Sequence, residues 1–208
     1  MGSKLVRPAG LDRRAGCRHP IVVAAPAKRR ATYEDLLAVP ANLVAEIIFG
    51  ELLTQARPAS RHARASSRLG GALDGPFDRG RGGPGGWVIL YEPELHLHED
   101  VVVPDFAGWR RERMPEMPDV AAFTLSPDWV CEVLSPSTAG VDRIEKMQIY
   151  ARERVTHVWH LDPLAQSLQV FRLEGAAYVL VGGWRGDVEV RAEPFDAVPL
   201  ELGALWQR

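Results

Sequence analysis

The run DWVCEVL, residues 128–134, is apolar at every position except its first residue and Glu132. A strand that is apolar on both faces is typical of the centre of a sheet covered on both sides. The next segment, residues 137–155, has apolar residues at helical spacing (Val141, Ile144, Met147 and Tyr150). Residues 157–162, HVWHLD, then have the composition of a second strand. A strand, a helix and another strand in succession predict a parallel crossover.

Shorter elements surround this unit in the sequence. The pattern predicts a short helix in TYEDLLAVP, a hairpin in VAEIIFGELLTQ and a surface helix in ASRHARASSRLGGALDGPF. Further strands are expected at 87–91, 94–99, 167–174 and 176–184, and VVVPDFAGW forms a strand that breaks at Pro104. The predicted fold class is therefore α/β, with a mixed central β-sheet flanked by helices.

The length of 208 residues suits one domain. Residues 1–30 carry a net charge of +7, which leaves −9 on the remainder. We expect a poorly ordered basic leader over 1–30, either a solvated segment or a nucleic-acid-binding arm, and a single domain over 31–208. Two cysteines are too few for a disulfide framework, so a cytoplasmic location is expected. No apolar run reaches the roughly 20 residues of a membrane-spanning helix.

Glu132 is the acid inside the predicted central strand. Side chains alternate along a strand, so Val130, Glu132 and Leu134 share one face while Cys131 and Val133 share the other. An ionised carboxylate in such surroundings is costly unless it is paired or bound to a metal ion. The alternative is that this face of the sheet is exposed to solvent.

Asp105 follows a proline at the point where a second apolar strand must loosen. Taken alone, it is an ordinary turn residue. Together with Glu132 it supplies carboxylates at two strand ends, and Mg²⁺ is usually held by one or two carboxylates, waters and substrate phosphate.

Lys146 lies on the helix that follows Glu132. It is four residues after Asp142 and four before Tyr150, so the three side chains share a helix face. One interpretation is a surface ion pair with Asp142, which would contribute about 0.2–0.5 kcal/mol. The other is that Lys146 points back to the metal ion and orients a water or a phosphate.

The chain resembles the Uma-type family of restriction-endonuclease-like proteins, a branch of the PD-(D/E)xK nuclease superfamily, over about Thr32 to Tyr178. The resemblance rests on AEIIFGEL, a histidine at the next helix start, VPDFAGW, PDWVCEVLSPST and VWHLDP. It implies a restriction-endonuclease-like core in which Asp105 and Glu132 bind Mg²⁺ (or Mn²⁺), with Glu46 as an auxiliary acid. Leu134 stands where most of the superfamily has its lysine, so the family resemblance assigns that role to Lys146.

Two further positions depart from the family pattern. Phe49 replaces an aspartate that is often found before Gly50, and Arg154 stands where a glycine is usual before Val155. Neither position is one of the core acids.

The resulting expectation is metal-dependent hydrolysis of DNA, with Asp105, Glu132 and Lys146 as catalytic residues and Glu46, Asp142 and Tyr150 as auxiliary ones. We expect contacts to the nucleic-acid backbone from Arg57, Arg61, His62, Arg64 and Arg68. A homodimer is the expected assembly. The alternative is a non-catalytic nucleic-acid-binding or assembly protein on a nuclease scaffold. A hydrolase acting on RNA or on a small phosphodiester is a third interpretation.

Overall fold

The computed structural model describes residues 29–56 and 59–207. The leader up to residue 28, and with it most of the predicted basic segment, lies outside the described residues, as does Arg57. No helix in the described ranges is long and apolar enough to cross a membrane.

A six-stranded sheet forms the centre of the molecule, in the order β10-β9-β8-β7-β6-β3. Its strands are β3 (Trp87–Tyr91), β6 (Phe106–Arg110), β7 (Trp129–Val133), β8 (His157–Asp162), β9 (Ser167–Glu174) and β10 (Ala177–Arg185). The β7–β8 pair is parallel and every other pair in this sheet is antiparallel. The mixed sheet and its parallel crossover are therefore confirmed, with β7 buried along its whole length.

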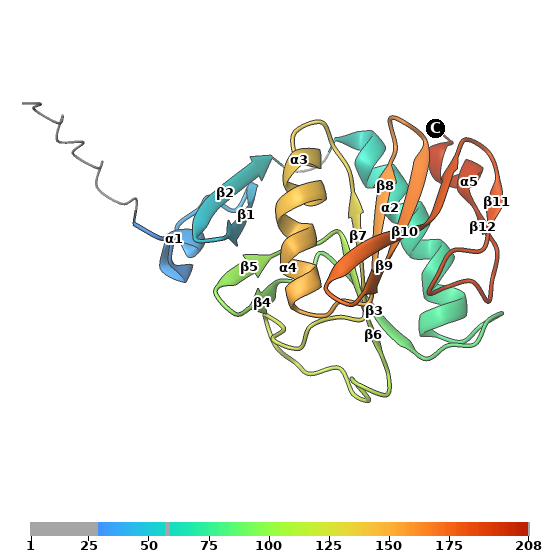
Figure 1. Ribbon diagram of the computed structural model, residues 1–208, viewed down its shortest axis with the longest axis horizontal. Helices are drawn as coiled ribbons and strands as arrows, with labels where there is room; N and C mark the ends of the chain where they lie inside the picture. The colour runs from blue at the N-terminus through green and yellow to red at the C-terminus, as the bar shows by residue number, and fades with distance from the viewer. Residues whose placement is uncertain (1–28, 57–58, 208) are drawn as a thin grey trace, which may run out of the picture.

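A second sheet of four strands stands beside the first, in the order β2-β1-β5-β4 (Figure 1). It contains β1 (Leu43–Ile48), β2 (Glu51–Ala56), β4 (Leu95–Leu97) and β5 (Asp100–Val102). The sequence pattern did not indicate that these strands form a sheet separate from the central one. VVVPDFAGW is divided between the two sheets, and residues 103–105 form the link from β5 to β6. A third, two-stranded sheet pairs β11 (Glu189–Val190) with β12 (Leu200–Glu201).

Helices cover both faces of the central sheet (Figure 1). The segment after β7 is one helical run with three parts, α3 (Ala139–Val141), the π-helical η2 (Asp142–Lys146) and α4 (Met147–Arg152). Its Ile149 and Tyr150 belong to the same core as Val130 of β7. The helix α2 (Ser60–Leu73) lies on the opposite face and continues into the π-helical η1 (Asp74–Asp78). The C-terminal α5 (Leu202–Trp206) packs on that face too.

The helix α2 is more buried than the surface helix that was predicted. Its Ala65, Leu69 and Leu73 pack against Cys131 and Val133 of β7 in one core. Glu132 therefore faces the α3–α4 side, as strand alternation requires. The alternative of a solvent-exposed sheet face is wrong, because Glu132 is 2% exposed.

The short helix α1 (Tyr33–Leu37) begins as its sequence predicts. The Thr32 hydroxyl accepts from the Asp35 amide, and the Asp35 carboxylate accepts from the Thr32 amide. This reciprocal capping box satisfies two amides that a helix start would otherwise leave unpaired.

The β1–β2 hairpin turns through Phe49 and Gly50, whose φ angles are +52° and +81°. A two-residue turn with both φ values positive suits Asn-Gly, whereas a phenylalanine is strained there. The Phe49 ring is exposed, so little packing offsets this strain. We expect Phe49→Asn to raise the free energy of unfolding by about 1 kcal/mol, measured by urea unfolding. Phe49→Ala removes the ring without suiting the turn, and an equal gain from it would contradict this explanation.

His160 lies on β8 beside Glu132 and is 2% exposed. Its Nε2 has no hydrogen-bond partner among the described residues. Burial, followed by the nearby Arg143 charge, lowers the pKa of His160 to about 4, so the ring is neutral at physiological pH.

This pKa makes stability depend on pH. An unfolded histidine titrates near 6.5, so between about pH 6.5 and pH 4 the unfolded chain binds a proton that the folded chain does not. Stability therefore falls as the pH drops through this window, by about 2–3 kcal/mol near pH 4.5. The free energy of unfolding is measured with urea near pH 7.5 and near pH 4.5. We expect its decrease between the two pH values to be about 2–3 kcal/mol smaller in His160→Leu than in the parent. If both proteins lose the same stability between pH 7.5 and pH 4.5, a group other than His160 causes the loss at acid pH.

Candidate active site

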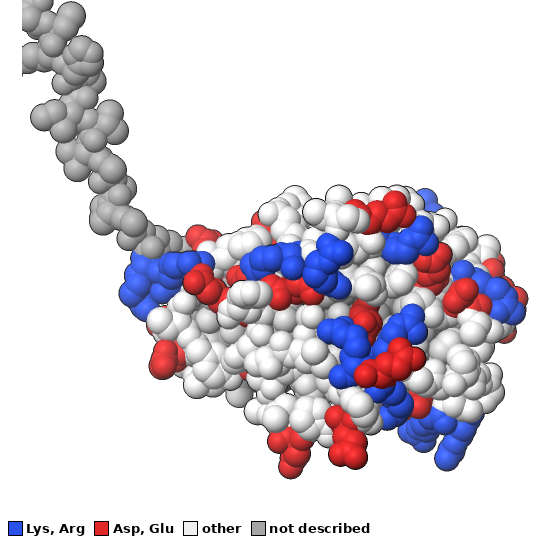
Figure 2. All heavy atoms as spheres, turned by 60° about the horizontal axis from the view of Figure 1, so that its bottom comes forward, with Lys and Arg blue, Asp and Glu red and all other residues white. Residues whose placement is uncertain are grey.

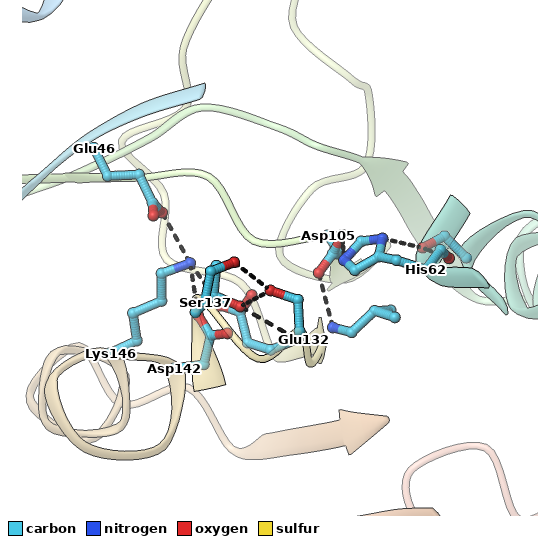
Figure 3. Close-up of polar contacts among 11 residues, drawn as sticks. Glu46, His62, Asp105, Glu132, Ser137, Asp142 and Lys146 are labelled. Atoms are coloured by element: carbon cyan, nitrogen blue, oxygen red, sulfur yellow. Dashed lines mark hydrogen bonds and ion pairs between the residues drawn. The ribbon is translucent and has the colours of Figure 1, made fainter. Parts of the chain in front are cut away.

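A cavity of about 240 Å³ lies where β7 ends, β6 begins and α2 begins. Asp105, Glu132 and Lys146 all line it, together with Asp142 and His62. In Figure 3, Lys146 and Asp142 point from their helix toward Glu46, while His62 meets Asp105 from the side of α2. The three residues predicted as catalytic therefore border one cavity, although they come from the β5–β6 link, from β7 and from the helical run after β7.

Asp105 is held by contacts to both of its carboxylate oxygens. The Val133 amide donates to Oδ2 at 2.8 Å. His62 Nε2 lies 3.1 Å from Oδ1. The first contact joins Asp105 to the residue that follows Glu132, so the two acids are held near each other at this end of the β6–β7 pair.

Glu132 makes two polar contacts through one oxygen. The Tyr150 hydroxyl donates to Oε1 at 2.5 Å, and Lys146 Nζ lies 3.3 Å from the same atom. Burial raises the pKa of Glu132 well above its ordinary value, and the negative charges of Asp142 and Asp105 add to this effect while Lys146 opposes it. The site therefore favours a proton or a cation on Glu132.

Lys146 is fully enclosed, with 2% of its surface exposed. Besides Glu132, its Nζ contacts Glu46 Oε1 at 2.9 Å and Asp142 Oδ1 at 3.4 Å. The interpretation of Lys146 and Asp142 as a surface ion pair is wrong, because both side chains are buried. Burial favours the neutral amine, but Glu132 and Glu46 outweigh it and hold the Lys146 pKa well above its ordinary value. Lys146 is therefore an ammonium ion.

The second sheet contributes Glu46, which lies on β1. Its Oε1 accepts a hydrogen bond from the Val103 amide at 2.7 Å as well as contacting Lys146. Glu46 thus joins the β5–β6 link to the lysine. Tyr150 comes from α4, and burial, then the Glu132 charge, raises its pKa well above the ordinary value. It therefore stays a phenol that can donate to Glu132.

The residues predicted to contact nucleic acid divide into separate groups. His62 is turned inward and is 9% exposed. Arg61, Arg64 and Arg68 are exposed along α2 and do not line the cavity. Arg57 is outside the described residues.

Several lining residues of the cavity were not predicted from the sequence. They are the hydroxyl residues after β7 (Ser135, Ser137 and Thr138), together with Gln55 and Glu92. The three hydroxyls are linked to one another, because Ser135 Oγ lies 2.9 Å from Ser137 Oγ and 3.0 Å from Thr138 Oγ1. Their signal was the dense run of hydroxyl residues in SPST directly after the strand that carries Glu132.

The donor set at the cavity suits a hard divalent cation. Carboxylate oxygens are the ligands that Mg²⁺ prefers, and it commonly takes only one or two of them. Within 29–56 and 59–207, no group of three or more His, Cys, Asp or Glu side chains is arranged to hold a metal ion. A cation here would therefore be held by Asp105 and Glu132, with water and substrate oxygens completing its shell.

The mixed sheet with its flanking helices is a restriction-endonuclease-like fold of the kind found in nucleases. Among solved structures, the chain aligns with the crystal structure of "a putative nuclease belonging to DUF820" from Anabaena variabilis, at a TM-score of 0.69 and 19% identity. The alignment covers 85% of this chain and 97% of that one. The Uma2 model, described as "Putative restriction endonuclease", matches residues 30–202. The chain belongs to the Uma2 family, and no curated protein matches it.

Proposed function

We propose that this protein is a Mg²⁺- or Mn²⁺-dependent endonuclease that hydrolyses phosphodiester bonds in DNA. The observation that carries the proposal is the shared cavity, which Asp105, Glu132 and the buried ammonium ion of Lys146 line together. Membership of the Uma2 family and the nuclease fold support the same class of activity.

Each residue has a role that its contacts suggest. Asp105 and Glu132 would hold the cation, which when bound polarises a phosphodiester and lowers the pKa of a water molecule. Lys146 is protonated and cannot act as a general base, so its role is to stabilise negative charge on phosphate. Tyr150 and Lys146 both fix Oε1 of Glu132.

The use of lysine in this chain supports a special role for Lys146. It is the only lysine after residue 28, whereas 18 arginines occur in the same part of the sequence. Arginine therefore supplies nearly all of the surface positive charge. A compact ammonium ion fits among three carboxylates where a planar guanidinium does not.

The exposed arginines of α2 are candidates for contact with the DNA backbone. Arg61, Arg64 and Arg68 are spaced by three and four residues, so they form one stripe on a helix whose first turn borders the cavity. By contrast, the face shown in Figure 2 has basic and acidic side chains interspersed, which does not favour it as a DNA-binding surface.

A cleavage assay tests the proposal. Purified protein is incubated with supercoiled DNA, linear DNA and RNA, with Mg²⁺, Mn²⁺ or excess chelator. We expect cleavage of DNA that requires the metal ion and is lost in Asp105→Asn. Asp119→Asn, at an exposed position, is the matched control and should cleave like the parent.

Two other outcomes would replace the proposal. DNA binding without cleavage under all of these conditions would favour the non-catalytic scaffold. Cleavage of RNA alone would favour the third interpretation.

A further inference from the structure

We infer that His62 is a positioning residue that fixes the orientation of Asp105 for metal binding, rather than a residue that contacts DNA. The inference rests on the proposed metal-binding role of Asp105. It assigns a function to the first turn of α2, which lies across the cavity from the helix that carries Lys146.

Asp105 needs side-chain contacts to define its orientation. It is the last residue of the link between β5 and β6, which belong to different sheets, and is not part of a strand itself. Its carboxylate is fixed by Val133 on one oxygen and by His62 on the other. Without His62, one anchor remains, and a carboxylate held at a single oxygen can rotate about its side-chain bonds.

His62 is itself held rigidly. Ser66 lies one turn further along α2 and is 1% exposed. Its Oγ donates to the His62 carbonyl at 3.0 Å and lies 3.4 Å from Nδ1 of the ring. The ring thus has Asp105 at Nε2 and Ser66 at Nδ1. Both ring nitrogens are engaged within the protein, which leaves neither for a phosphate.

A residue that orients a metal ligand raises the affinity for the metal ion without contacting the ion itself. Loss of such a partner typically weakens metal binding about 10–100-fold. We therefore expect His62→Ala to bind Mn²⁺ about 10–100-fold more weakly than the parent. DNA affinity measured in excess chelator should be unchanged, because both ring nitrogens of His62 contact protein groups.

The experiment measures Mn²⁺ binding by electron paramagnetic resonance on the purified full chain. His62→Gln keeps an amide N–H near the position of Nε2 and should recover most of the affinity. Ser66→Ala leaves the imidazole in place without its support, so it should lose affinity in the same direction but by less. The adjacent Ser67→Ala, at an exposed position, is the matched control and should bind like the parent.

The outcomes separate this inference from the proposed function. If Asp105→Asn weakens Mn²⁺ binding while His62→Ala does not, the inference is overturned and the metal site stands. Unchanged Mn²⁺ affinity with weaker DNA binding in His62→Ala would make His62 a DNA contact instead. If Asp105→Asn binds Mn²⁺ like the parent, the metal site is misplaced and the inference falls with it. Should His62→Ala fail to fold, the Mn²⁺ affinities of the other two variants decide. Affinity that is reduced in Ser66→Ala and close to the parent in His62→Gln supports the inference, and parental affinity in Ser66→Ala overturns it.

Discussion

Lys146→Met is expected to lower the free energy of unfolding by about 3–5 kcal/mol near pH 8, because it leaves buried carboxylates without their cation. Methionine has a similar length, so little cavity forms. Three carboxylate oxygens, from Glu46, Glu132 and Asp142, lie within 3.4 Å of the ammonium. Urea unfolding of the metal-free protein measures the loss.

The loss should depend on pH in a defined direction. Lys146 is the neighbour that lowers the pKa of Glu132, whereas burial and the other acids raise it. In Lys146→Met the folded pKa of Glu132 therefore rises further above its unfolded value. A group with a raised folded pKa gives stability that is complete below the unfolded pKa and is lost as the pH rises. The variant should thus be closer to the parent near pH 5 than near pH 8.

Two controls show whether burial is the cause. Arg143→Met removes a cation three residues earlier whose side chain is 47% exposed and whose ion pair with Asp162 spans 3.5 Å. An exposed pair of this kind contributes about 0–1 kcal/mol. Lys146→Met combined with Glu132→Gln removes one of the stranded charges and should recover part of the loss. If Arg143→Met and Lys146→Met lower the free energy of unfolding equally, Lys146 is not an essential part of a buried charge network.

The burial of Glu132 and the crossover around it could be predicted because both are local properties of the sequence. Alternation within residues 128–134 defines which side chains share a face, and helical spacing over 137–155 places Lys146 on a helix. A further local signal for Lys146 is that it is the only lysine after residue 28, among many arginines.

The rest of the site depends on contacts between distant segments. Glu46 reaches Lys146 from a separate sheet, and no pattern within its own hairpin shows that β1 pairs with β5. His62 was predicted from the sequence as a contact to nucleic acid, together with the arginines of the same helix. Only the packing of α2 on the central sheet turns it toward Asp105. The π-helical turn at 142–146 likewise has no distinctive sequence pattern.

A rise in pH is expected to tighten metal binding by up to about tenfold per pH unit, because the cation must displace a proton from Glu132. Burial, with the charges of Asp142 and Asp105, holds the pKa of this carboxyl well above its ordinary value in the metal-free protein. As the pH rises toward that raised pKa, Glu132 is deprotonated in a growing fraction of molecules before the metal ion binds. The apparent affinity for Mg²⁺ therefore increases. Thermal melts with increasing Mg²⁺ at several pH values measure this trend.

Glu132→Gln should remove both the metal response and its pH dependence. Glutamine has a similar shape but cannot ionise. In the parent, ionisation of Glu132 lowers the stability as the pH rises, and this decrease should be absent from the metal-free variant. That decline amounts to about 1.4 kcal/mol for each pH unit between the unfolded and folded pKa values. Calorimetry in buffers of different ionisation enthalpy gives an independent measure, since the parent should release protons on binding Mn²⁺. Binding without proton release would mean that Glu132 is already ionised, and the buried ammonium of Lys146 would then outweigh the desolvation of its partner.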